Sequence, residues 1–168
     1  MTDAPHPIVN LSDLRLDWLS KGSRFQVGLG DIGRPLGLNG LGATMHVVPA
    51  HKTAWPFHRH YAKDELFLIL EGEGELRFGD RRLPIRAGDC IGCPAAGEAH
   101  QLINNSDNEL RYIAFSNRSQ AEVIEYPDSG RVSVDIARGL QRPADEFNLS
   151  GKFSPFGYWD GEDVDGSS

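Results

Sequence analysis

The stretch His58-Arg-His-Tyr-Ala-Lys-Asp-Glu-Leu-Phe-Leu-Ile-Leu-Glu-Gly72 decides the fold of this chain. Residues 65–70, in its second half, have the length and apolar composition of a short strand, and a Glu-Gly-Glu-Gly turn ends it. Successive side chains of a strand point to opposite faces, so Glu65 shares a face with Phe67 and Ile69. The opposite face carries three leucines. Because this strand is apolar on both faces, it should be covered on both sides, as in a sandwich or barrel.

Short strands separated by turns continue along most of the chain. Further strands are expected at residues 75–78, 81–86, 90–93, 101–104, 111–116, 121–126 and 131–136. Gly79-Asp80 is a hairpin turn signal, and Pro127-Asp-Ser-Gly130 is another. The 19 glycines and 10 prolines among 168 residues favour a turn-rich β chain over a helix bundle. The sequence therefore predicts an all-β fold, either a sandwich or a barrel.

A length of 168 residues fits one domain. We expect an N-terminal arm at residues 1–23, a β-barrel domain at residues 24–136, and an irregular C-terminal extension with an acidic tail at residues 137–168. A helical spacing of apolar residues occurs in the arm, at Leu11, Leu14, Trp18 and Leu19. With Ser12 as its cap, this spacing predicts a short helix that packs against the domain.

The charge and hydropathy of the chain argue against several classes of protein. A formal net charge of −7 opposes a phosphate-neutralising surface, so nucleic-acid binding is not expected. The longest apolar run, residues 66–70, is far shorter than the ~20 residues that span a bilayer, so no membrane segment is expected. Residues 1–7 carry neither the basic nor the apolar region of a secretory signal, which makes a cytoplasmic location the expectation.

Two familiar motifs suggest chemistry that the local sequence does not support. Cys90 and Cys93 form a Cys-x-x-Cys, but within a predicted strand their sulfurs would point to opposite faces, so we expect both to be buried and inert. Gly28-Leu-Gly-Asp-Ile-Gly33 matches a dinucleotide-binding pattern, yet such a site needs a helix to begin there. Residues 34–40 contain a proline and two glycines, so no nucleotide site is expected.

Three histidines and one glutamate are placed to meet at one point. His58 and His60 would project to the same face of a strand, ~6–7 Å apart at the backbone, so both imidazoles can reach one metal ion. Glu65 follows a short turn and starts the next strand, while His100 starts another strand after Pro94-Ala-Ala-Gly97. We predict that these four residues bind one divalent metal ion, and Fe, Mn, Ni, Co and Zn all remain open. One or two coordination positions would be left for water or substrate.

The first part of this pattern closely resembles the first motif of the cupin superfamily. That motif is a His-x-His followed by a glutamate and then by a glycine. Here four residues separate His58-Arg-His60 from Glu65, and six more lead to Gly72, which are the spacings of the family. Asp64 is the alternative carboxylate ligand, but only Glu65 has the family's spacing to Gly72.

The second cupin motif is a glycine, a Pro-x-Gly turn, a histidine and an asparagine. It is matched here by Gly88, Pro94-Ala-Ala-Gly97, His100 and Asn104. Two departures from the family are present. The turn is one residue longer, and Lys52 stands where the family has a glycine ahead of the first motif. The longer turn would shift His100 slightly, although its spacing to Gly97 and Asn104 is kept.

The resemblance implies a double-stranded β-helix, or jelly roll, with the metal inside the barrel. It implies no single reaction, because cupins include isomerases, dioxygenases, lyases and non-catalytic binders. The terminal Tyr158-Trp-Asp-Gly-Glu162 is similar to a branch of single-domain bacterial cupins, some of which carry the label of sugar-phosphate isomerase by similarity only. We expect a metal-dependent enzyme of isomerase or dioxygenase type, acting on a sugar, a sugar phosphate or an organic acid. The alternatives are a non-catalytic ligand-binding or sensing protein, and a module whose metal only braces the barrel.

Several residues near the pattern are expected to lie outside the site. Arg59 should point away from the metal, because strand side chains alternate. His6, His46 and His51 lie outside both motifs and are interpreted as surface or packing histidines. The second apolar face of residues 65–70 predicts cover by the N-terminal arm, by another chain or by both, and related cupins commonly pair there, so a homodimer is expected.

Overall fold

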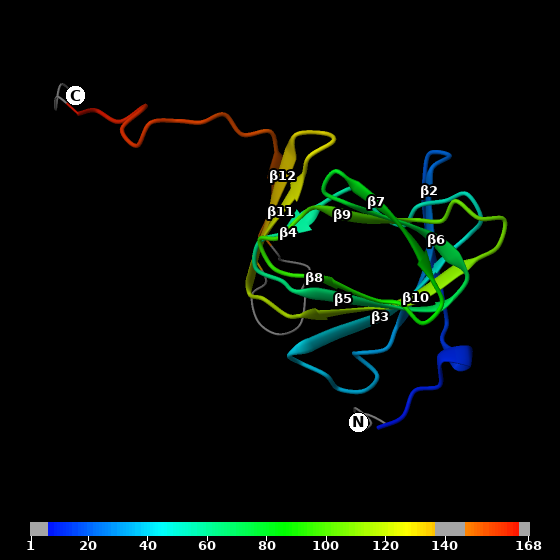
Figure 1. The fold of residues 1–168 in the computed structure, drawn as a ribbon. Coiled ribbons are helices and arrows are strands. Elements are labelled where there is room, and N and C mark those ends of the chain that lie inside the picture. Colours follow the sequence, from blue (N-terminus) through cyan, green and yellow to red (C-terminus); the bar gives the residue numbers. More distant parts are fainter. Residues whose placement is uncertain (1–6, 137–146, 165–168) are drawn as a thin grey trace.

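Nearly every regular element of the structure is a β-strand (Figure 1). The computed structural model describes residues 7–136 and 147–164. Its strands are β1 (Asp17–Lys21), β2 (Phe25–Asp31), β3 (Leu41–Val48), β4 (Arg59–His60), β5 (Glu65–Glu71), β6 (Glu73–Phe78), β7 (Arg81–Arg86), β8 (Cys90–Cys93), β9 (His100–Ile103), β10 (Leu110–Asn117), β11 (Ala121–Tyr126), β12 (Arg131–Ile136) and β13 (Phe147–Gly151). A 3-10 helix, η1 (Leu11–Asp13), precedes them. Within the described ranges no helix is long and apolar enough to cross a membrane. The all-β prediction is confirmed.

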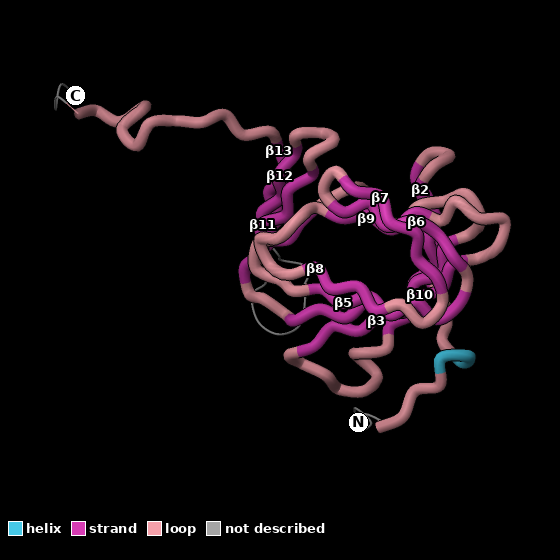
Figure 2. The backbone as a smooth tube through the Cα atoms, in the orientation of Figure 1, coloured by secondary structure: helices cyan, strands magenta, loops and turns pink. Residues whose placement is uncertain are grey.

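Three antiparallel sheets build the fold. The largest has the strand order β1-β2-β3-β10-β5-β8, the second has β7-β6-β9, and the third has β13-β12-β11-β4. Figures 1 and 2 show the first two sheets facing each other across the interior, with the third sheet at one end. Strands far apart in sequence are neighbours in space, because β10 pairs with both β3 and β5. This arrangement fits the jelly roll that the cupin resemblance implied.

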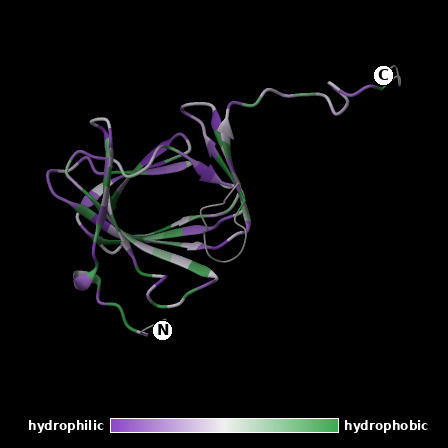
Figure 3. Ribbon diagram, turned by 180° about the vertical axis from the view of Figure 1, so that it is seen from behind, coloured by the Kyte–Doolittle hydropathy of each residue, from purple (hydrophilic) through white to green (hydrophobic). Residues whose placement is uncertain are grey.

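Apolar side chains of both facing sheets fill the interior. Phe67 and Ile69 of β5 are buried there, as the alternation predicted, together with Leu76 of β6 and Tyr112 of β10. Leu66, on the opposite face of β5, is 44% exposed. Figure 3 shows apolar and polar segments interspersed along the strands. The inward positions therefore form the core, and the outward face of β5 is left partly uncovered.

The N-terminal arm does not form the predicted helix. Only one 3-10 turn is present, and Asn10 rather than Ser12 caps it, since the Ser12 amide donates to Asn10 Oδ1 at 3.0 Å. The chain then extends, and β1 pairs with the edge of β2. A short isolated helix is marginal in water, whereas the edge of β2 offers a row of backbone hydrogen bonds. The arm therefore adds a strand to the largest sheet.

The glycines of the Gly28–Gly33 pattern make room for this arm. A Cβ on Gly28 would lie 3.1 Å from the Trp18 ring, and a Cβ on Gly30 would lie 3.2 Å from Leu14. Both glycines belong to β2, and turns follow that strand where a nucleotide site would need a helix. The pattern is thus explained by packing, in line with the expectation that it binds no nucleotide.

The two cysteines occupy opposite faces of β8, as predicted. Cys93 is buried, but Cys90 is exposed, so the expectation that both would be buried is wrong for Cys90. Strand alternation sends one of the two side chains outward, and among the described residues no element covers Cys90 on that face of β8. Burial raises the pKa of the Cys93 thiol to about 12, which keeps it protonated and unreactive at neutral pH.

The C-terminal extension contributes a strand that the sequence did not reveal. β13 pairs with β12, with Leu149 opposite Val134. After β13 the chain runs away from the barrel (Figure 1), and its aromatic residues are exposed there. The parts of the predicted arm and extension at residues 1–6, which include His6, at residues 137–146 and at residues 165–168 lie outside the described residues.

Replacing Gly72 with alanine should destabilise the fold strongly. Gly72 has a φ of +82°, and a Cβ there would lie 2.3 Å from the carbonyl oxygen of Glu109. We expect the free energy of unfolding, measured by chemical denaturation, to fall by about 3 kcal/mol or more, from left-handed backbone strain plus steric overlap. Gly88→Ala is the matched control, because Gly88 has a φ of +92° and nothing lies within 4 Å of its Cβ position. That variant should lose only about 1 kcal/mol, and equal losses would contradict the role of the overlap.

Candidate metal centre

Three strands bring the four predicted ligands to one end of the interior. His58 directly precedes β4, His60 lies in β4, Glu65 begins β5, and His100 begins β9. The backbones of His58 and His100 pair as an isolated antiparallel bridge, with hydrogen bonds from His58 N to His100 O at 3.2 Å and from His100 N to His58 O at 2.7 Å. The His-x-His segment and the second motif are therefore held side by side by the backbone itself.

The side chains of the four residues converge. One ligand atom from each of His58, Glu65 and His100 lies within 4.8 Å of the others. His100 Nε2 is 2.9 Å from Glu65 Oε2, and His60 Nε2 is 3.4 Å from the same oxygen. The His58 ring centroid lies 5.0 Å from that of His60 and 4.8 Å from that of His100. The structure thus brings together all four residues that the sequence singled out.

The extra residue in the Pro94–Gly97 turn does not displace His100. Ala96 takes a left-handed conformation, with a φ of 57°, and its amide donates to the carbonyl of His60 at 2.7 Å. The amide of Gly97 closes the turn by donating to the carbonyl of Pro94 at 3.0 Å. The added residue is absorbed by this local conformation, so the shift expected for His100 does not separate it from Glu65.

Burial keeps the imidazoles of His58 and His60 neutral. Burial, together with the neighbouring imidazoles of His100 and His60, lowers the pKa of His58 to about 4, and burial also lowers the pKa of His60. Burial alone would raise the pKa of Glu65, but the hydrogen bond with His100 and the electrostatic interaction with His60 outweigh it and leave the pKa of Glu65 below its usual range. Metal ions bind neutral imidazoles and ionised carboxylates, so these groups are in their ligand forms at neutral pH.

The donor set fits a divalent metal ion. His58 Nδ1 lies 2.8 Å from the carbonyl oxygen of Pro56, a contact that places the ring proton on Nδ1 and leaves Nε2 with its lone pair. A backbone partner of this kind is the usual support of a metal-binding histidine. Three imidazoles and one carboxylate form a mixed nitrogen and oxygen set suited to Fe, Mn, Ni, Co or Zn. The residues present therefore match the group that the cupin resemblance implies.

The alternative candidates lie outside this cluster. Asp64 Oδ1 accepts a hydrogen bond from the Ala95 amide at 2.8 Å, so this carboxylate supports the turn before His100. Arg59 points to the other face of β4, where its Nε donates to Glu125 Oε2 at 2.7 Å.

The two remaining described histidines have structural contacts of their own. His46 is buried, and both of its ring nitrogens are in use, Nδ1 at 3.2 Å from Thr44 O and Nε2 as acceptor from Trp55 Nε1 at 3.1 Å. His51 is exposed and contacts Asp107 at 2.9 Å. Their interpretation as packing and surface histidines is confirmed.

One residue at the centre escaped the sequence analysis. Glu122 of β11 is only 2% exposed, and its Oε2 lies 3.6 Å from His60 Nδ1. Alternation places Glu122 on the same face of β11 as Ile124, which lies opposite His60. The sequence did hold a signal for it, because an acidic residue on the inward face of a strand is typical of a polar interior.

An aromatic side chain lies beside His58, and a cationic side chain lies against that aromatic ring. The Tyr126 ring stacks on the His58 ring with their centroids 6.0 Å apart. Arg131, opposite Tyr126 on β12, places its Cζ 3.8 Å from the centroid of the Tyr126 ring. A planar ring thus lies next to the cluster, and a positive charge lies against that ring; both suit contact with a small anionic or polar ligand.

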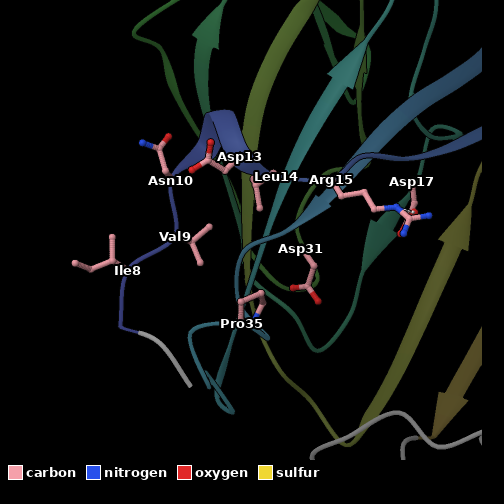
Figure 4. Close-up of a pocket in the computed structure, with 9 residues that line it drawn as sticks. All are labelled: Ile8, Val9, Asn10, Asp13, Leu14, Arg15, Asp17, Asp31 and Pro35. Atoms are coloured by element: carbon pink, nitrogen blue, oxygen red, sulfur yellow. Dashed lines mark ion pairs between the residues drawn. The ribbon is translucent and has the colours of Figure 1, made fainter. Parts of the chain in front are cut away.

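A surface cavity lies at a distance from these ligands, beside the N-terminal arm. It has a volume of about 750 Å³ and is lined by the N-terminal arm and the loop after β2, including Leu14, Asp13, Asp17 and Asp31 (Figure 4). None of the four predicted ligands lines it. Its polar side chains are largely occupied locally, since Arg15 pairs with Asp17 at 3.9 Å and Asp31 with Arg34 at 3.1 Å. This cavity is a groove beside the arm and is separate from the metal centre.

Two facing antiparallel sheets around a His and Glu cluster define a small β-barrel protein with a polar interior site. Comparison with known families agrees, because residues 43–116 match the family model described as a cupin domain. The matched stretch runs from β3 to β10 and includes all four predicted ligands. This part of the chain therefore matches the cupin family, as the motifs in the sequence indicated.

The proteins that this chain resembles carry different names. An oxalate-binding protein of Thermotoga maritima is 33% identical over 57 residues, which cover 34% of this chain and about half, 46%, of that relative. The crystal structure of a cupin-superfamily sugar phosphate isomerase from Silicibacter pomeroyi superimposes with a TM-score of 0.74 and 20% identity, over 90% of this chain and 98% of that chain. The crystal structure of a candidate sugar phosphate isomerase from Acidithiobacillus ferrooxidans superimposes with a TM-score of 0.71 and 19% identity, over 84% of this chain and 90% of that chain. These structural likenesses establish the fold alone.

Proposed function

We propose that this protein is a metal-dependent cupin enzyme in which His58, His60, Glu65 and His100 bind one divalent ion. The observation that carries the proposal is the convergence of three imidazoles and one carboxylate, with Glu65 Oε2 at 2.9 Å from His100 and 3.4 Å from His60. A bound ion would supply a Lewis acid for a chelating oxygen of the substrate, or an oxygen-binding centre if it is Fe(II). The protein would supply the ligand set, which consists of neutral imidazoles and one ionised carboxylate, and the neighbouring side chains that orient the substrate.

We propose a small polar substrate, such as a sugar, a sugar phosphate or an organic acid. Arg131 and Tyr126 support this class, because a guanidinium and an aromatic ring beside His58 suit a ligand with an anionic group and a compact polar body. The names of the relatives are compatible with it, since oxalate and sugar phosphates are both small anions. An isomerase or a dioxygenase reaction would fit such a substrate.

A non-catalytic, ligand-binding cupin is the second candidate, and one observation favours it. His46, Cys93 and Tyr112 are buried titratable groups outside the ligand set, and all three are neutral at pH 7. Burial lowers the pKa of His46 to about 4, raises that of Cys93 to about 12, and raises that of Tyr112 above its usual range. None of these three groups is poised to exchange a proton with a substrate near neutral pH.

Elemental analysis of protein purified without added metal tests the proposal. We expect about one divalent ion per chain, lost on dialysis against a chelator and regained when one metal is added back. The loaded and the metal-free protein would then be compared in a thermal-shift screen of sugars, sugar phosphates and dicarboxylates. Metal-dependent binding with turnover supports the enzyme, and metal-dependent binding alone supports the second candidate. Absence of stoichiometric metal under all loading conditions would overturn both.

We also propose that the protein is a homodimer. The arm covers part of the outer face of the largest sheet, where Leu14 and Leu16 pack against Met45 and Ile113. Leu66 remains 44% exposed on the outer face of β5, and Trp18 is 49% exposed. A second chain would bury these side chains. Light scattering at micromolar concentration should give twice the 18.5 kDa of one chain, and a monomer mass would contradict the proposal.

A further inference from the structure

We propose that Glu122 is a positioning residue that holds His60 in the tautomer with its proton on Nδ1, so that Nε2 is the ligand atom. The inference rests on the proposed metal site, but it concerns a residue outside the ligand set. Glu122 lies on β11, in a different sheet from Glu65. It approaches His60 at Nδ1, whereas Glu65 approaches the same ring at Nε2.

Donors from four consecutive residues surround this carboxylate. The amides of Tyr61 and Ala62 donate to Glu122 Oε1 at 3.0 and 3.1 Å. Lys63 Nζ lies 4.0 Å from Oε2, and His60 Nδ1 lies 3.6 Å from the same oxygen. These residues form the link between His60 and the strand that begins with Glu65. Glu122 therefore anchors the segment that sets the distance between two of the proposed ligands.

The two oxygens of Glu122 have different tasks. Oε1 holds the backbone of the turn, whereas Oε2 is buried and has no hydrogen-bond partner among the described residues. His60 Nδ1 is likewise buried and without such a partner. The two atoms are 3.6 Å apart, slightly beyond hydrogen-bond distance. A small movement would let His60 Nδ1 donate to Glu122 Oε2, which would give each of these buried atoms a partner.

The chemistry of this pair selects one tautomer. A carboxylate only accepts hydrogen bonds, so it favours a proton on His60 Nδ1. Nε2 then carries the lone pair and lies 3.4 Å from Glu65 Oε2, on the side of the proposed metal. A carboxylate behind a metal-binding histidine sets the ring orientation and raises its strength as a ligand. His58 is held in the same tautomer by a different partner, the carbonyl of Pro56.

The variant Glu122→Gln separates this role from support of the turn. The glutamine side chain has the same length, and its oxygen can still accept from the amides of Tyr61 and Ala62. Its NH2 group then takes the place of Oε2 and donates toward His60 Nδ1. His60 must respond with its proton on Nε2, and that nitrogen can no longer bind a metal. The matched control is Glu125→Gln, on the same strand but on the outer face, where Glu125 contacts Arg59 and Tyr61.

The experiment begins with long-range 1H–15N NMR spectra of the metal-free protein, which report the tautomer of each histidine. We expect His60 to carry its proton on Nδ1 in the wild type and in Glu125→Gln, and on Nε2 in Glu122→Gln. Titration with Zn²⁺ against a chromophoric chelator should then show about a 10–100-fold weaker affinity in Glu122→Gln alone.

Two outcomes would overturn the inference. One is a proton on His60 Nε2 in the wild-type protein, a measurement that stays decisive even if Glu122→Gln does not fold. The other is a folded Glu122→Gln with the wild-type tautomer and unchanged Zn²⁺ affinity. A wild-type protein that binds no metal but shows the expected tautomers would instead refute the proposed function and leave the role of Glu122 intact.

Discussion

Replacing His58 and His60 together with alanine should reduce bound metal from about one ion per chain to a small fraction of that value. Both imidazoles belong to one segment, and only Glu65 and His100 would remain as ligands. Loss of a single ligand already weakens a site of this kind, and the two remaining donors would hold a divalent ion poorly. The measurement is metal content by elemental analysis after purification and again after loading with one metal followed by desalting.

The control for this experiment is His51→Ala. The exposed side chain of His51 contacts Asp107 and none of the four proposed ligands, so its loss should leave both the fold and the metal content unchanged. His46→Gln should also keep its metal, because both ring nitrogens of His46 are committed to Thr44 and Trp55. Circular dichroism would establish that the double variant is folded. Stoichiometric metal in a folded His58→Ala/His60→Ala protein would refute the assignment.

The alternation of side chains along short strands was enough to predict the core of this fold. It placed Glu65, Phe67 and Ile69 on one face of β5, and the structure buries Phe67 and Ile69 between the sheets. It also sent Arg59 away from the cluster. Strands at β7, β8, β11 and β12 begin and end where the turn residues predicted, because glycine, proline and aspartate act locally on the backbone.

Features that depend on distant partners were beyond the reach of such patterns. The spacing of Leu11, Leu14 and Trp18 is helical, yet the segment pairs with β2, because an open strand edge and the notches at Gly28 and Gly30 decide its conformation. Tertiary pairing overrides a weak local preference of this kind. The strand β13 was missed for the same reason, since within the part of the chain that the structure describes it pairs with β12 alone.

In the candidate site, too, local patterns were predicted from the sequence and contacts between distant segments were not. His58, His60, Glu65 and His100 were found because each lies at a motif position whose spacing is local. Glu122 was missed because its role depends on β11 meeting β4, a contact between segments some 60 residues apart, as in the hydrogen bond from Tyr61 N to Glu122 Oε1. An acidic residue on the inward face of a strand indicates a polar interior, but the structure is needed to show which group that residue contacts.

Acid should destabilise the metal-free protein through its buried neutral histidines. Burial lowers the pKa of His46 from 6.5 to about 4. Between those two values the unfolded chain binds a proton at this residue and the folded protein does not. The stability that His46 contributes is therefore fully present above pH 6.5 and is lost as the pH falls toward 4. A shift of this size corresponds to about 3 kcal/mol of unfolding free energy.

Urea denaturation of metal-free protein at pH 7 and pH 4 measures this effect by difference. His46→Gln removes the titrating group. Between pH 7 and pH 4 the variant should therefore lose about 3 kcal/mol less unfolding free energy than the wild type loses. Carboxylates such as Glu65 also titrate in acid, but they do so in both proteins and cancel in the comparison. His51→Gln serves as the control, since His51 is exposed, and should follow the wild type. If His46→Gln loses as much stability as the wild type on acidification, His46 is not held neutral by the fold, and the interior at this point is open to water.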